Sequence, residues 1–174
     1  MNSISDINLN NDYRHNCKIN EPNLVILKCG EAGQIILPDT TPGGTTATIA
    51  TVTIDTSKFC NPCTKLEFTS NIIATPTSPT APVVGTLNFQ VFRFCNDQQP
   101  IPIGGQFSLA VAQATAVPAS TIFTFFVCDC NQCLNGCCTY AITVTAAGTI
   151  ITGNIGVFAA RLAAITVDNP EQYY

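Results

Sequence analysis

Five cysteines lie close together near the C-terminal third of this sequence. They are Cys128, Cys130, Cys133, Cys137 and Cys138. Such a cluster can bind a metal ion, carry out redox chemistry, or form disulfides within a chain or between chains. The remaining cysteines, which are also candidates for disulfides or cross-links, are Cys17, Cys29, Cys60, Cys63 and Cys95.

The segment Cys60-Asn61-Pro62-Cys63 has the spacing of a thioredoxin-like redox pair. That chemistry requires the first cysteine near the N-terminus of a helix, because the helix dipole lowers the pKa of the thiol. Residues 64–69 instead alternate between polar and apolar side chains, which is typical of a strand. The sequence therefore disfavours a redox enzyme.

A zinc site is a stronger alternative. Two Cys-x-x-Cys pairs, Cys60 with Cys63 and Cys130 with Cys133, would supply four thiolates in tetrahedral geometry. Six cysteines would then remain outside the site, and we expect no resident metal or cofactor. A zinc-binding β domain stays open as an alternative.

The sequence offers no set of residues for hydrolysis. His15 is the only histidine, so a Ser–His or Cys–His pair would have to use it. The acidic residues are scattered singly, without a pair placed for acid–base chemistry. We expect the protein not to be an enzyme.

Disulfides explain the cluster best. Asn135-Gly136 is a preferred centre for a two-residue hairpin turn, which would place Cys133 opposite Cys138 in a non-hydrogen-bonded pair. The Cα atoms of such a pair are about 4.5 Å apart, at the short end of the disulfide range. Neighbouring Cys137 and Cys138 would point to opposite faces of a strand. One can therefore bond within the domain while the other faces outward.

Composition excludes several classes of protein. The chain has 174 residues, enough for one domain with a real core, and a net charge of −4. It has no basic surface for a phosphate backbone, so we expect no nucleic-acid partner. No stretch approaches the roughly 20 continuous apolar residues of a membrane helix, so we expect no membrane partner.

Low charge has a second implication. Only 10% of residues are charged, against about 25% in ordinary soluble domains, and such a neutral surface suits burial against other protein. A compact secreted domain with a neutral surface is the plainer interpretation. Ten cysteines indicate an oxidising compartment, yet residues 1–6 lack the basic and apolar regions that begin a signal peptide.

The first 23 residues differ from the rest of the chain. They contain seven asparagines, few apolar side chains (Ile4, Ile7, Leu9 and Ile19) and the single thiol of Cys17. A segment of this composition is usually a disordered tail. An extended arm with its own cysteine is also suited to lying along another subunit, so we divide the chain into an arm, residues 1–23, and a β-sandwich domain, residues 24–174.

From residue 24 onward the sequence predicts strands almost throughout. Threonine alternates with Ile, Val and Ala, and Pro-Gly-rich turns separate the runs, which indicates an all-β fold: an antiparallel sandwich of the jelly-roll type. A helix competes only over residues 157–164, where we predict a strand. The predicted strands are residues 24–29, 34–37, 48–54, 65–73, 83–94, 107–112, 121–128, 139–145, 149–152 and 156–167, and residues 100–105 are predicted to be a break.

Four stretches carry a resemblance to a known family. They are residues 27–35, 59–68, 87–92 and 126–140. They resemble a cysteine-rich domain of unknown function from endospore-forming clostridia and relatives, over residues 24–167. In its threonine-rich, low-charge β character the sequence is also similar to the endospore appendage (Ena) pilin subunits of bacilli.

The appendage resemblance implies jelly-roll subunits that polymerise into stiff fibres on spores. It implies an N-terminal connector that reaches into neighbouring subunits and is fixed by disulfides, and synthesis in the mother cell without a signal peptide. This sequence has one arm cysteine, Cys17, where a pair is usual, so the number of cross-links and the fibre symmetry stay open.

We therefore expect a structural subunit whose partner is itself. It would assemble head to tail into a disulfide-stabilised filament outside the cell, on the spore surface, through arm exchange and strand addition at sheet edges. A non-filamentous spore coat protein is the alternative from the same class.

Overall fold

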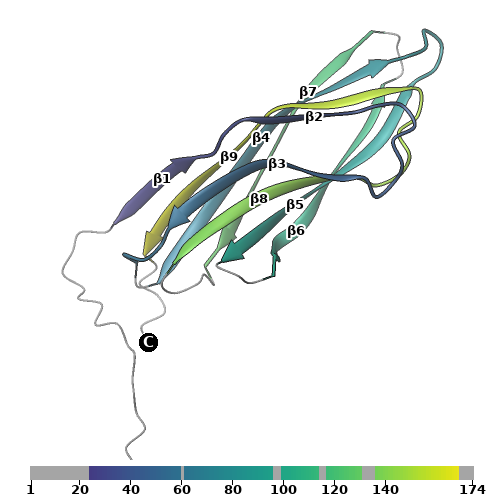
Figure 1. Ribbon diagram of the computed structural model, residues 1–174. Helices are drawn as coiled ribbons and strands as arrows, with labels where there is room; N and C mark the ends of the chain where they lie inside the picture. The colour runs from purple at the N-terminus through teal and green to yellow at the C-terminus, as the bar shows by residue number, and fades with distance from the viewer. Residues whose placement is uncertain (1–23, 60, 96–98, 114–116, 131–135, 169–174) are drawn as a thin grey trace, which may run out of the picture.

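Strands account for most of the chain (Figure 1). The computed structural model describes residues 24–59, 61–95, 99–113, 117–130 and 136–168, and the predicted arm lies outside this part of the chain. The described residues contain no helix long and apolar enough to cross a membrane. Their strands are β1 (Val25–Cys29), β2 (Gly33–Leu37), β3 (Thr46–Asp55), β4 (Pro62–Pro76), β5 (Val83–Cys95), β6 (Ile101–Gln113), β7 (Ala119–Asp129), β8 (Cys137–Ala146) and β9 (Gly153–Asp168).

The strands form two antiparallel sheets packed face to face. The first sheet has the order β1-β9-β4-β7, and β2 also pairs with β9, so β1 and β2 together form one interrupted edge strand. The second sheet has the order β3-β8-β5-β6. The chain passes repeatedly from one sheet to the other between these strands, as in a jelly roll. The predicted fold class is confirmed.

The core follows from the alternation of the central strands. In β4 and β5, inward residues such as Leu66, Phe68, Leu87 and Phe89 are buried, while the residues between them face outward. Burial of each such side chain contributes about 1.5–3 kcal/mol. A half-buried aromatic cluster continues this core toward β6 and β7, where the rings of Phe107 and Phe125 stack with their centroids 4.1 Å apart.

Residues 157–164, for which a helix was the alternative, belong to strand β9, so the predicted strand is confirmed. It lies between the β1–β2 edge and β4, and it pairs with all three. Two neighbours satisfy its backbone groups, so pairing outweighs the helical tendency of its alanines. Ala159 has a positive φ of 49°, where the register shifts and the strand bends.

One predicted strand and one predicted break were wrong. Residues 149–152 are not a strand, because Thr152 has a φ of 59° and only Ile151 makes a single bridge, to Val84. The break expected at residues 100–105 is instead the start of β6. An edge strand tolerates Pro102, and Gly104, with a φ of 68°, lies at a register shift.

The interrupted edge strand lies close against the second sheet. A Cβ atom at Gly30 would collide with the carbonyl oxygen of Thr51, and one at Gly33 with that of Ile49. Glycine therefore lets β1 and β2 approach β3 closely on their inner side.

Candidate functional site: the cysteine end and the open strand edges

Six of the described cysteines gather at one end of the sandwich, which we call the cysteine end. Cys63 is the second residue of β4 and Cys95 ends β5, while the others lie at the end of β7 or the start of β8. The strand registers align these termini, since Thr64 pairs with Asp129 and Cys95 pairs with Cys138. Figure 1 shows the ends of β5 and β9 on the same side of the molecule.

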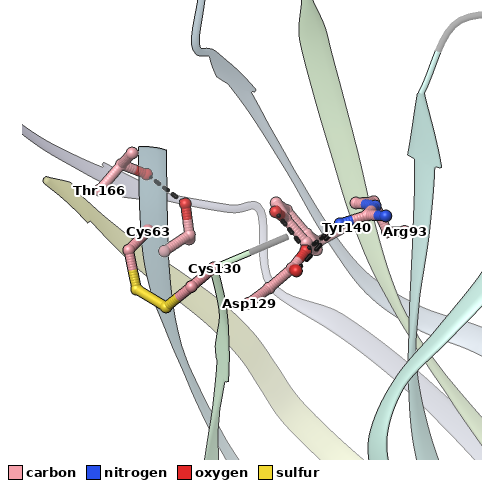
Figure 2. Close-up of polar contacts among 7 residues, drawn as sticks. Cys63, Arg93, Asp129, Cys130, Tyr140 and Thr166 are labelled. Carbon is pink, nitrogen blue, oxygen red and sulfur yellow. Dashed lines mark hydrogen bonds and ion pairs between the residues drawn. A yellow bond between two sulfur atoms is a disulfide. The ribbon is translucent and has the colours of Figure 1, made fainter. Parts of the chain in front are cut away.

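One disulfide joins two strands of the first sheet at this end. Cys63 is bonded to Cys130, the residue that follows β7, and their Cα atoms are 4.0 Å apart (Figure 2). Cys95 is also disulfide-bonded. Beside Cys63, the hydroxyls of Thr64 and Thr166 form a buried hydrogen bond of 2.6 Å.

The disulfide bears on the zinc alternative. Two of the four thiolates required for that site, Cys63 and Cys130, are joined to each other here. Cys60 and Cys133 lie outside the described residues. Within the described residues, no group of three or more His, Cys, Asp or Glu side chains is placed to hold a metal ion.

The remaining described cysteines separate by exposure. Cys29, Cys128 and Cys137 carry exposed thiols, whereas Cys138 is buried. The expectation that neighbouring Cys137 and Cys138 face opposite sides of a strand is confirmed. The predicted Cys133–Cys138 bond involves Cys133, which lies outside the described residues, as do Asn135, Cys17 and His15.

A buried polar network spans the two sheets next to the disulfide. Arg93 of β5 donates from Nη1 to both carboxylate oxygens of Asp129 on β7, at 2.9 and 2.7 Å. Tyr140 of β8 donates its hydroxyl to Asp129 Oδ2 at 3.0 Å (Figure 2). Burial, followed by the charge of Asp129, raises the pKa of Tyr140 well above its usual range. The tyrosine therefore keeps its hydroxyl proton at alkaline pH values at which an ordinary tyrosine loses it.

Sequence reasoning missed this network. Its signal was the presence of charged residues at inward strand positions: Asp129 alternates with the outward Cys128 and Cys130, and Arg93 alternates with the apolar side chains of β5. A charge that faces a core requires a partner of opposite sign.

The outer face of the first sheet carries exposed apolar side chains on β1 and along β7. Leu27 is 65% exposed, Phe126 63% and Ile122 76%. The registers place Leu27, Ile165, Lys65 and Cys128 side by side across the four strands. Lys65 forms an ion pair with Glu67, and its Nζ lies 5.2 Å from the centroid of the Phe126 ring. These exposed apolar side chains leave a surface that other protein could cover.

Both edges of this sheet carry backbone groups that point outward. The Gly30 N–H donates to the Leu162 carbonyl at 2.8 Å. Hydrogen-bonded and non-hydrogen-bonded pairs alternate in an antiparallel ladder, so the N–H and C=O of Leu27 and Cys29 point away from β9. Following the same alternation through β9 and β4, the backbone groups of Cys128, Phe126 and Ile122 point away from β4, toward the open side of β7.

Among the described residues, the edge formed by β7 lacks the usual protection. The only charged residue of β7 is Asp129, which faces inward. Exposed edge strands are normally blunted with lysines, prolines or bulges, because a long apolar edge pairs with other chains. Along its 11 residues β7 has no lysine and no proline.

The chain resembles solved structures only weakly. No curated protein matches the chain. Similar solved structures share between 9% and 13% identity with it at TM-scores of 0.26–0.38, values too low to support any argument about function. They include PorU from Porphyromonas gingivalis (13% identity, 84% of this chain and 13% of PorU, TM-score 0.38), Eiger TNF from S. frugiperda (9%, 88% and 98%, 0.35) and a xylan-binding domain from Paenibacillus barcinonensis (10%, 78% and 83%, 0.29).

A family model matches most of the sequence. The match covers residues 23–167, and the family is described as a domain of unknown function, DUF4489. It includes all nine strands of the described sandwich except the last residue of β9. The chain belongs to the DUF4489 family.

Proposed function

We propose that this protein is a structural subunit that assembles with copies of itself into a disulfide-stabilised filament outside the cell. The filament is an endospore appendage or similar pilus-like fibre on the spore surface. Subunits join head to tail, through strand addition at sheet edges and exchange of the N-terminal arm. The subunit performs no catalysis and requires no cofactor.

The open edge of β7 carries this proposal. It presents outward N–H and C=O groups along an 11-residue strand, next to the exposed side chains of Ile122 and Phe126. Such an edge would bind other chains in an uncontrolled way if it were left open. A filament occupies it with a strand from the neighbouring subunit.

The cysteine end suits a fibre that bears mechanical load. The Cys63–Cys130 bond and the Arg93–Asp129 ion pair fix the end of β7 to both sheets. Exposed thiols lie on this rigid frame, where an oxidant converts contacts between subunits into covalent bonds. The similarity to endospore appendage subunits supports the same conclusion from the sequence.

One substitution tests the role of the β7 edge. Ile122→Pro removes a single outward N–H group and leaves the bonds to β4 in place, and edge strands tolerate proline. The matched control is Ile122→Ala, which removes the side chain but keeps the N–H. Negative-stain electron microscopy should show filaments for the wild type and the alanine variant, and folded, unassembled subunits for the proline variant.

The same experiment separates the alternative. A non-filamentous coat protein would give discrete particles or monomers for all three proteins. If wild-type protein purified under oxidising conditions forms no filaments, the proposed function is wrong.

A further inference from the structure

Two exposed thiols occupy matching positions on opposite edges of the first sheet. Cys29 lies on β1 and Cys128 lies on β7, and both are exposed. Both also face the outer side of the sheet, because Cys29 pairs with Ala163 in the row that contains Glu67 and Phe126. Cys128 lies in the adjacent row, with Lys65 and Leu27. Along the strand direction, the two thiols are therefore two residues apart.

The strand directions allow this sheet to continue into a second copy. Each neighbouring pair in the order β1-β9-β4-β7 is antiparallel, so β1 and β7 run in opposite directions. A copy displaced sideways without rotation therefore places its β1 antiparallel to β7 of the first copy, with the same face outward. At about 4.8 Å per strand, the displacement is about 19 Å.

Hydrogen-bond alternation selects the register. In a paired ladder, residues whose backbone groups point outward must lie opposite each other. Cys128 and Cys29 both have outward groups, as derived from the Gly30–Leu162 bond and the registers. If the second copy also shifts by two residues along the strand direction, about 7 Å, the two cysteines lie directly opposite each other in a hydrogen-bonded pair. Their Cα atoms would then be about 5.5 Å apart, well within the range for a disulfide.

We propose that β7 of one subunit pairs with the interrupted β1–β2 edge strand of the next, and that a disulfide between Cys128 and Cys29 of the next subunit locks this contact. In this register Cys128 and Asp129 lie opposite Cys29 and Lys28 of β1, and residues 120–124 lie opposite β2. The proposal rests on the proposed function and specifies the two edges that meet. The contact joins two different surfaces. A row of subunits therefore has one free edge at each end, to which further subunits can add. Repeated addition, with the slip and the natural strand twist, generates an open helical fibre rather than a closed ring.

Formation of the bond is a two-electron oxidation. A low-molecular-weight disulfide such as glutathione disulfide is the oxidant: the Cys29 thiolate attacks it and releases one glutathione thiolate. The Cys128 thiolate of the adjacent subunit then attacks the Cys29 sulfur and releases the second glutathione. Two protein thiols lose two protons and two electrons, and two glutathione thiols are formed.

Complementary single variants test the pairing. In the full chain carrying Cys17→Ser and Cys137→Ser, we add either Cys29→Ser or Cys128→Ser, oxidise with glutathione disulfide, alkylate, and run non-reducing gels. The parent should form a ladder of covalent oligomers, and each variant alone should remain monomeric. An equal mixture of the two variants should form covalent dimers and nothing larger, because each chain then contributes one of the two thiols.

Other patterns would overturn the proposal. Dimers from the Cys29→Ser protein alone would indicate a symmetric Cys128–Cys128 contact, and dimers from the Cys128→Ser protein alone would indicate a Cys29–Cys29 contact. A mixture without dimers would also contradict it, provided that circular dichroism shows both variants to be folded. Filaments that form without a Cys29–Cys128 peptide in mass spectrometry would leave the proposed function intact and reject only this lock.

Discussion

Arg93 and Asp129 form an ion pair that crosses from one sheet of the sandwich to the other. Their side chains are 9% and 4% exposed, and the shorter Nη1–Oδ2 distance is 2.7 Å. Asp129 is also the inward residue between Cys128 and the disulfide-bonded Cys130. The pair therefore anchors the strand end that presents the outward thiol of Cys128.

Breaking this pair should destabilise the subunit. Arg93→Met removes the cationic partner of the buried Asp129 carboxylate, which still accepts a hydrogen bond from the Tyr140 hydroxyl. Loss of one partner from a buried ion pair costs about 3–5 kcal/mol. Urea unfolding followed by circular dichroism should show a loss of stability of this size.

The triple variant Arg93→Met, Asp129→Leu and Tyr140→Phe is the control. It removes both charges and the buried hydroxyl that donates to Asp129, and apolar replacement of a whole buried pair is often close to neutral. Stability should therefore recover most of the way to wild type. A single variant as stable as the wild type would show that the pair does not anchor β7.

The raised pKa of Tyr140 predicts that the free energy of unfolding decreases at alkaline pH. Its pKa in the folded protein is raised, so above about pH 10 the unfolded chain releases this proton while the folded chain retains it. The tyrosine's contribution is complete below pH 10 and declines as the pH rises further. Urea midpoints measured between pH 8 and pH 11 should fall more steeply for the wild type than for Tyr140→Phe. Equal slopes would contradict a raised pKa.

The Cys63–Cys130 disulfide should stabilise the folded subunit. It closes a loop with a sequence separation of 67 residues, for which the chain-entropy relation gives about 4 kcal/mol. The double variant Cys63→Ser with Cys130→Ser should lose stability of this order, measured by urea unfolding without reductant. Cys137→Ser, at an exposed thiol, should unfold like the wild type. Equal stability of the double variant and the wild type would show that the bond is not formed in the native protein.

The fold could be predicted because the pattern is local. Alternation of threonine with apolar residues in β3 and β4 marks strands directly, and Pro-rich turns such as residues 76–82 separate them. The opposite orientation of Cys137 and Cys138 follows from the same period of two.

The features that could not be predicted depend on contacts between distant residues. The partners in Cys63–Cys130 and in Arg93–Asp129 are far apart in the sequence. The jelly-roll strand order brings each pair together. The start of β6 was missed because proline and glycine usually indicate a turn, whereas an edge strand accepts them at a register shift. The matching outward positions of Cys29 and Cys128 became visible only once the sheet order and registers were known.

The N-terminal arm should determine whether subunits polymerise. Residues 1–23 are too polar to form a core, but they carry Ile4, Ile7, Leu9 and the single thiol of Cys17. Fully extended, 23 residues span at most about 80 Å, enough to reach across a neighbouring subunit. We expect the arm to gain apolar contacts there and a covalent bond at Cys17. Among the described cysteines of the 128–138 cluster, the exposed Cys137 remains as its partner if Cys128 bonds to Cys29.

Deletion of residues 1–23 tests this role of the arm. The sandwich should remain folded, with unchanged circular dichroism, but it should form no filaments in negative-stain micrographs. Cys17→Ser should still form filaments, because the non-covalent contacts persist, and these should dissociate in hot detergent at a lower temperature than wild-type filaments. Wild-type filaments treated with reductant should dissociate in the same way. Filaments of normal stability from the truncated protein would show that the arm is an ordinary tail and that strand addition alone builds the fibre.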